Sequence, residues 1–202
     1  MQATDDITLL REYAASHSEE AFETLVSRYL RLVYSAALRQ TSDSHSAEEV
    51  TQAVFIVLAR KAGRISPDTI LSGWLFKTTR YVALTQARTA ARRRQYEQEA
   101  YMRPEDQLNP PNPLWDNIAP LLDEALAQLR EKDRQAVLLR YFENKNLSEV
   151  GSALGAGEDA TRMRINRALE KLHRYFTKRG VISTSAIIAA VISQTPYRLR
   201  PL

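Results

Sequence analysis

A cluster of prolines divides the chain into two parts. Half of its eight prolines lie within ten residues, at Pro104, Pro110, Pro111 and Pro113. Because proline cannot continue a helix and disfavours helical backbone at the residue before it, this stretch predicts an extended linker. The expected divisions are a first domain at 1–97, the linker at 98–117, a second domain at 118–180 and a C-terminal extension at 181–202.

Both sides of the linker carry a helical pattern. The chain is rich in Ala, Leu, Arg and Glu, which favour helices, and its apolar residues recur at the spacing of amphipathic helices. No stretch shows the alternation of apolar and polar residues that marks a half-buried strand. The predicted fold class is all-α, with two small helical domains joined by the Pro-rich linker and followed by a short apolar helix.

Capping signals place the individual helices. Ser18 and Ser46 are each positioned to cap a helix, and Glu49 has the spacing to complete a capping box with Ser46. Asn146 and Glu149 repeat this signal in the second domain. The expected helices span about 7–15, 19–41, 47–61 and 73–96 in the first domain, and 121–129, 133–143, 147–154 and 158–176 in the second.

Residues 147–174 combine a short helix, a glycine-bearing turn and a longer helix with a basic face, which is the arrangement of a DNA-binding helix-turn-helix. Arginine can pair with guanine and asparagine with adenine in the major groove, whereas flanking cations neutralise phosphates. The candidate duplex-binding residues are Arg162, Met163, Arg164, Asn166, Arg167 and Lys171. An amphipathic helix whose arginines are merely solvated is the alternative.

The helix expected at 73–96 interleaves aromatic and basic residues. Aromatic rings stack on unstacked bases and cations attract the backbone, so this mixture is typical of binding to single-stranded or melted nucleic acid. The candidates are Trp74, Lys77, Arg80, Tyr81, Arg88, Arg92 and Arg93. For Trp74, a place in the hydrophobic core is the favoured alternative.

Charge is segregated along the chain. The net charge is only +4, but residues 74–103 and 151–180 carry balances of +5 and +4, while 1–73 and 104–150 carry −3 and −4. Two basic segments that alternate with acidic ones indicate two contacts with a polyanion, and acidic surface for another partner. Solvated helix faces are the competing interpretation.

The sequence also argues against several classes of site. It has no cysteine, which excludes disulfides and thiol chemistry and fits a reducing cytoplasm. His17, His45 and His173 are far apart without metal-ligand spacing, and no glycine loop suits a phosphate. No apolar run reaches the roughly 18 residues of a membrane-spanning helix. We therefore expect a cytoplasmic protein that is not an enzyme, with no catalytic residue, metal, cofactor or stable membrane insertion.

Four stretches resemble the sigma-70 family of bacterial RNA polymerase initiation factors. They are AFETLVSRY, AEEVTQAVF, LSGWLFKTTRYVAL followed by ARRR, and the whole segment 125–172. The resemblance covers about residues 7–180 in the order of the family, with the linker where the compact extracytoplasmic-function (ECF) group has its linker. It implies a sigma region 2 bundle before the linker and a sigma region 4 helix-turn-helix after it.

The resemblance also implies roles and partners. In the family, the helix matching AEEVTQAVF docks on the clamp helices of the largest subunit of core RNA polymerase. This points to Glu48, Glu49, Gln52 and Phe55. The segment matching 64–94 recognises and melts the minus-10 element and captures a flipped base, and the helix-turn-helix binds the minus-35 element as duplex. The implied partners are core polymerase and promoter DNA, duplex and melted, with an anti-sigma factor as a further candidate.

A few residues depart from the family pattern. Gly151 stands where alanine is usual, and Thr161 stands where an apolar β-branched residue is usual. We expect both substitutions to be mild. Tyr81 and Thr85 also differ from the usual minus-10 residues, so the preferred bases are not predicted. The alternative function is a free-standing helix-turn-helix repressor or activator, which would bind promoter DNA without core polymerase.

The apolar run at 181–192 lies beyond the family pattern and is too short to span a bilayer. Docking on the protein itself is its favoured role. Contact with a partner or an autoregulatory contact is the second interpretation, and association with a membrane is the third.

Overall fold

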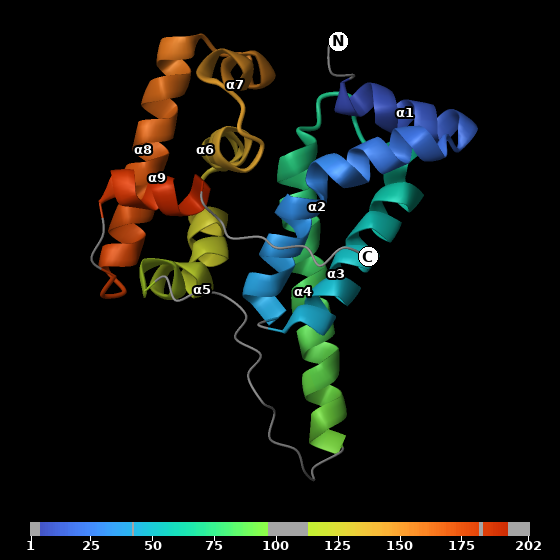
Figure 1. Cartoon of the computed structure of the whole chain (residues 1–202), viewed down its shortest axis with the longest axis horizontal. Helices are drawn as coiled ribbons and strands as arrows, with labels where there is room; N and C mark the ends of the chain where they lie inside the picture. Colours follow the sequence, from blue (N-terminus) through green and yellow to red (C-terminus); the bar gives the residue numbers. More distant parts are fainter. Residues whose placement is uncertain (1–4, 42, 97–112, 182–183, 194–202) are drawn as a thin grey trace. The chain divides into compact units, whose positions relative to one another are not determined.

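The structure is a computed structural model that describes residues 5–41, 43–96, 113–181 and 184–193. In these ranges the chain is helical and contains no strand, so the all-α fold class is confirmed. The chain divides into two compact units, unit 1 at Met1–Pro110 and unit 2 at Pro111–Leu202 (Figure 1). Most of the predicted linker at 98–117 lies outside the described residues.

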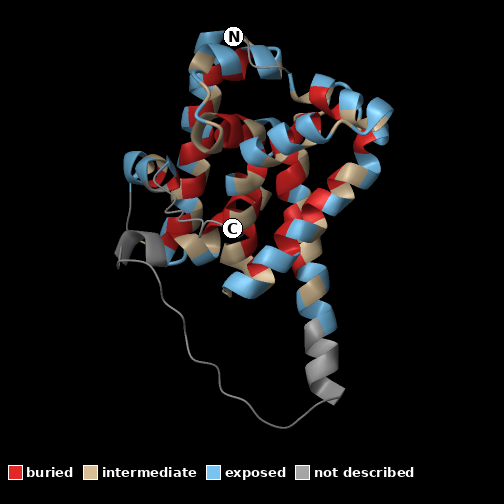
Figure 2. Cartoon of the chain, turned by 45° about the vertical axis from the view of Figure 1, so that its right-hand side comes forward, coloured by how far each residue is buried: buried red, intermediate tan, exposed pale blue. Residues whose placement is uncertain are grey.

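Unit 1 is a bundle of helices around one core. It contains α1 (Asp6–Ser16), α2 (Glu19–Thr41), α3 (Ser44–Lys61), the 3-10 turn η1 (Ala62–Arg64) and α4 (Leu71–Tyr96). Helices α2, α3 and α4 pack against one another, and α1 packs on α2 and η1. Figure 2 shows buried residues along the facing sides of these helices. The largest fully buried side chains in this unit are Leu10, Leu25, Tyr29, Leu58, Leu71, Leu75 and Phe76.

Helix α3 begins earlier than the sequence predicts. Asp43 is its N-cap, and the Asp43 carboxylate accepts a hydrogen bond from the backbone N–H of Ser46 at 2.9 Å. The predicted capping box between Ser46 and Glu49 is therefore wrong, because an earlier carboxylate already satisfies the first turn. Glu49 instead lies 3.4 Å from Nε2 of His45, one turn away.

The predicted start of α2 is correct, whereas α4 starts earlier than predicted. Ser18 caps α2 as predicted, since its hydroxyl accepts from the backbone N–H of Ala21 at 3.2 Å. Helix α4 starts at Leu71, before the predicted start, and the N–H of Trp74 closes its first turn by donating to the carbonyl of Ile70 at 3.2 Å. The gap between the helices expected at 47–61 and 73–96 is thereby reduced to η1 and the loop 65–70.

Unit 2 is organised around α8. It contains α5 (Pro113–Gln128), α6 (Glu131–Val137), the π-turn η2 (Leu138–Phe142), α7 (Leu147–Leu154), α8 (Glu158–Thr177) and α9 (Ser185–Ser193). Helix α8 contacts α5, α6, α7 and α9. Its apolar stripe is buried as predicted, at Ile165, Ala168, Leu169, Leu172 and Phe176.

Two helices of unit 2 differ from their predicted form. Helix α5 starts at Pro113, inside the stretch predicted as linker, because proline is accepted at a first helical position that needs no N–H donor. The helix predicted at 133–143 ends in a wider turn. There the N–H of Glu143 donates to the carbonyl of Leu138, five residues back, at 3.2 Å.

The turn between α7 and α8 follows the prediction. The side chain of Asn146 accepts from the N–H of Glu149 at 2.9 Å, and Glu149 accepts from the N–H of Asn146 at 2.7 Å, which completes the predicted capping box. Gly155 ends α7 with φ of 63°, a left-handed conformation that glycine adopts without strain.

Gly151 allows this turn to pack closely. A Cβ added at Gly151 would lie 2.5 Å from the carbonyl oxygen of Ala156 and 3.1 Å from Oγ1 of Thr161. Thr161 is fully buried, and its hydroxyl donates to the carbonyl of Gly157 at 2.9 Å. The departure at Gly151 is therefore a requirement of this backbone and not a mild substitution.

We expect Gly151→Ala to lower the free energy of unfolding of unit 2 by about 1–3 kcal/mol, because the added methyl group would push against the backbone. Denaturant unfolding of the full chain, followed by circular dichroism, measures this loss. Gly157→Ala is the matched control, since a Cβ at Gly157 meets nothing within 4 Å. An unfolding midpoint for Gly151→Ala as high as that of the control would contradict the close packing.

The C-terminal extension packs on unit 2. Helix α9 lies against α8 and η2 (Figure 1). Its side chains Ile188 and Ile192 are buried. The hydroxyl of Thr184 accepts from the N–H of Ile187 at 3.2 Å and so supports the first turn of α9. Docking on the protein itself, the favoured role of this segment, is confirmed for the described residues.

Candidate nucleic-acid interface

The exposed arc of α8 carries four of the six predicted duplex-binding residues. They are Arg162, Met163, Asn166 and Arg167, and all four lie opposite the buried stripe. Met163 is 60% exposed, so an apolar contact with a base is sterically open to it. We call these four residues the open arc.

The two arginines of the open arc have contacts that DNA can replace at low cost. Arg162 lies 3.3 Å from Glu158 and 3.6 Å from Asp159, in pairs whose members are all more than half exposed. Exposed pairs of this kind contribute little to stability. Nε of Arg167 donates to the carbonyl of Met163 at 3.2 Å, along the same helix.

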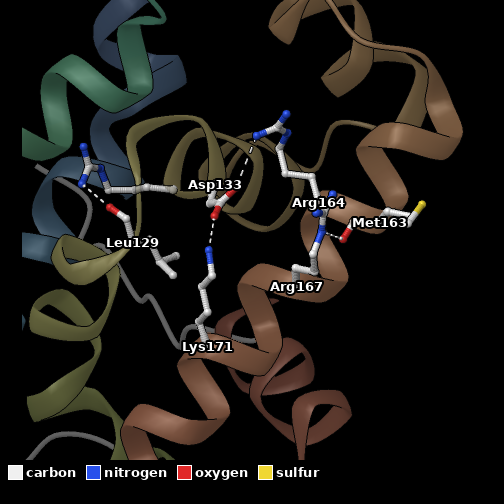
Figure 3. Close-up of polar contacts among 7 residues, drawn as sticks. Leu129, Asp133, Met163, Arg164, Arg167 and Lys171 are labelled. Carbon is white, nitrogen blue, oxygen red and sulfur yellow. Dashed lines mark hydrogen bonds and ion pairs between the residues drawn. The ribbon is translucent and has the colours of Figure 1, made fainter.

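Arg164 and Lys171, the other two predicted residues, are bound to α6. Asp133, in the first turn of α6, accepts from Arg164 at 3.3 Å and from Lys171 at 2.6 Å. Figure 3 shows both cationic side chains pointing toward this carboxylate, while Met163 points away from it. Asp133 does not stand out in the sequence, because an acidic residue in the first turn of a helix is also what the helix dipole favours.

One face of α4 exposes an aromatic side chain between cations. Tyr81 is 72% exposed and Leu84 is 47% exposed. Lys77 and Arg88, which are also exposed, lie on the same face one turn before Tyr81 and one turn after Leu84. Arg80 is half-buried beside this face. The predicted residues Arg92 and Arg93 belong to the last turns of α4, where the side chains lie outside the described part of the structure.

A hollow opens where the loop 65–70 meets the start of α4. Its volume is about 460 Å³, and its lining residues are Lys61, Arg64, Ile65, Ser66, Thr69 and Trp74. Trp74 is half-buried, so it belongs partly to the core and partly to this hollow. Hydroxyls and cations around an indole suit a base edge, a phosphate and a stacked ring. Lys61, Ser66 and Thr69 do not stand out in the sequence, since helix ends and loops commonly contain such residues.

The exposed face of α3 contains three of the four residues predicted to bind polymerase. Glu48, Glu49 and Gln52 are exposed, whereas Phe55 is only 8% exposed and belongs to the core of unit 1. Its neighbour Ile56 is 51% exposed. The apolar side chain that this face offers to a partner is therefore Ile56.

The described residues offer neither of two further kinds of site. Within those ranges, no helix combines the length and apolar character that crossing a membrane requires. The same part of the chain brings together no three His, Asp or Glu side chains as ligands for a metal ion.

Known proteins resemble both units. The Sigma-70 region 2 family model matches residues 25–93, and the Sigma-70, region 4 model matches residues 125–174. RNA polymerase sigma factor CarQ of Myxococcus xanthus is 32% identical over 159 residues, which cover 77% of this chain and 88% of CarQ. ECF RNA polymerase sigma factor SigE of Mycolicibacterium smegmatis is 32% identical over 163 residues, which cover 79% of this chain and 63% of SigE.

Among solved structures, CnrH in complex with the cytosolic domain of CnrY overlaps 86% of this chain and 97% of its own, with 20% identity and a TM-score of 0.42.

The two matched segments contain the surfaces described above. The region 2 match runs from α2 to α4 and includes the exposed face of α3, and the region 4 match includes the open arc of α8. Both of the relatives named above are RNA polymerase sigma factors. The chain therefore belongs to the ECF group of the sigma-70 family, and it is a transcription initiation factor that directs RNA polymerase to promoters.

Proposed function

We propose that this factor holds its promoter at two places, with α8 on the minus-35 element as duplex and α4 on the melted minus-10 element. In this proposal, residues 1–97 also bind core polymerase, 118–180 bind the minus-35 element, and 98–117 connect the two. The observation that carries the proposal is the open arc of α8, which presents arginine, asparagine and methionine side chains opposite a buried stripe.

For the minus-10 element, the exposed face of α4 and the hollow beside it have complementary uses. Tyr81 offers a ring for an unstacked base, and Lys77 and Arg88 lie where they can follow the backbone. Flipping a base out of the stack costs a few kcal/mol, which a shaped hollow with cations at its wall helps to offset. We place that base against Trp74, with Lys61 and Arg64 near its phosphate.

For core polymerase, the proposed contact is the exposed face of α3, with Glu48, Glu49 and Gln52 followed by Ile56. Acidic and amide groups there suit a basic surface such as the family's contact on the clamp helices. In this scheme the factor acts in the cytoplasm, supplies no catalytic residue and uses no cofactor. An anti-sigma factor is a further proposed partner.

Transcription in vitro with core polymerase and a library of random promoters tests the whole proposal. We expect transcripts only when both proteins are present, and a shared pair of elements upstream of the start sites. Nuclease protection of the selected promoters without core polymerase is the second measurement. Strong protection by the factor alone would instead indicate a free-standing repressor or activator.

Replacing Tyr81 by alanine tests the contact with melted DNA. Loss of one stacked base is expected to cost about 1–3 kcal/mol, which reduces the fraction of open complexes. Permanganate reactivity of minus-10 thymines in the complete polymerase complex measures this fraction. Tyr81→Phe is the matched control, because it keeps the ring and should open promoters as the original protein does. Equal opening by Tyr81→Ala would remove Tyr81 from the proposed contact.

A further inference from the structure

We infer that Asp133 acts as an internal substitute for a DNA phosphate. By holding Arg164 and Lys171, it keeps two cations of α8 from neutralising the DNA backbone when the helix binds duplex. The sequence-independent affinity for DNA is then lower than it would be if all the cations of α8 were available to phosphates. This inference rests on the proposed role of α8 in duplex binding.

The geometry of Asp133, Arg164 and Lys171 favours both ion pairs at once. Each cation has its own oxygen of the carboxylate, with Arg164 at 3.3 Å from Oδ1 and Lys171 at 2.6 Å from Oδ2. The side chain of Asp133 is only 11% exposed, so it has little access to water. If both cations left for DNA, this carboxylate would remain buried without a counter-charge, which is costly.

Arg164 has a second feature that ties it to the protein. Its Nε atom is buried and has no hydrogen-bond partner, so this end of the guanidinium group lies against protein and away from solvent. Arg162 is more than half exposed, as are both of its acidic partners. A phosphate can therefore displace the partners of Arg162 readily, but it must compete with a buried carboxylate for Arg164.

The consequence concerns how affinity depends on salt. Each phosphate that a protein neutralises on duplex DNA adds about 0.9 to the slope of log affinity against log salt concentration. Arg164 and Lys171 held by Asp133 add nothing to this slope. Binding to DNA then relies more on the open arc, which can read bases, and less on charge that is the same at every sequence.

The first test compares Asp133→Asn with Glu170→Gln in the full chain. The probe is a fluorescein-labelled DNA duplex of mixed sequence, and anisotropy gives the affinity over a series of salt concentrations. We expect Asp133→Asn to make the slope steeper by about 0.9–1.8, because one or two cations are released to phosphates. Glu170→Gln removes the same charge from an exposed position of α8 and should leave the slope unchanged. An unchanged slope for a folded Asp133→Asn protein would overturn the inference.

A second pair of variants decides the matter even if Asp133→Asn fails to fold. Lys171→Gln leaves Arg164 to neutralise Asp133, and we expect it to bind the duplex with the original slope. Arg162→Gln removes the cation of the open arc whose exposed partners a phosphate can displace, and it should reduce the slope by about 0.9. If Lys171→Gln reduces the slope as much as Arg162→Gln does, the inference about Asp133 is wrong while α8 remains the duplex-binding helix. If Arg162→Gln changes nothing, the proposed role of α8 fails, and the inference fails with it.

Discussion

The double variant Gln52→Ala and Ile56→Glu is expected to abolish co-purification of this factor with core polymerase. Both side chains are exposed on α3, and Ile56 is the exposed large apolar residue of that face. The new carboxylate would be buried in the interface without a partner, which is expected to cost about 2 kcal/mol or more and to weaken binding about 30-fold or more. The unfolding midpoint should stay unchanged, since neither residue is in the core.

Two further variants separate docking from folding. Phe55→Ala is expected to lower the free energy of unfolding by about 3–5 kcal/mol, because Phe55 is buried in unit 1. A combined change of Gln52 and Phe55 would therefore affect folding and docking together. Leu84→Glu adds a carboxylate at an exposed position of α4 and should not disturb polymerase binding. Full co-purification of the Gln52 and Ile56 double variant would mean that polymerase binds another surface.

Arg167→Ala is expected to weaken binding to the minus-35 element by about 1–3 kcal/mol, if its guanidinium pairs with a base. The side chain is exposed and donates to a carbonyl of its own helix, so its removal should spare folding and polymerase binding. Competition between the original promoter and promoters with single changes in the minus-35 element, measured with the complete polymerase complex, tests this.

The control for Arg167 is Lys178→Ala, which removes a cation from the C-terminal end of α8. It should weaken binding less, and by the same factor at every sequence, as expected for a phosphate contact. A uniform loss across all sequences for Arg167→Ala would assign Arg167 to a phosphate as well. Equal loss of promoter binding and polymerase binding would show that unit 2 had unfolded.

Features that depend on neighbours in the chain could be predicted from the sequence. The capping box of Asn146 and Glu149 needs only two residues at fixed spacing, and the left-handed Gly155 needs only the position after a helix. The buried stripe of α8 follows from helical periodicity alone. The start of α3 was missed because Asp43 and Ser46 are both good caps, and local chemistry does not decide between them.

Features that depend on tertiary packing could not be predicted in this way. Asp133 is 31 residues from Arg164 and 38 from Lys171, so no spacing rule links them. The need for glycine at 151 comes from the carbonyl of Ala156 across a turn, which is a matter of backbone position.

The helix that covers part of the apolar surface of unit 2, α9, is synthesised after the elements that it covers. Ile188 and Ile192 cover apolar surface on α8 and η2, yet they leave the ribosome after both of those elements. A ribosome that adds about 5–20 residues a second needs on the order of one second to pass from α8 to the end of α9. During that interval the nascent DNA-binding domain presents an uncovered apolar face, which is the kind of surface that chaperones bind.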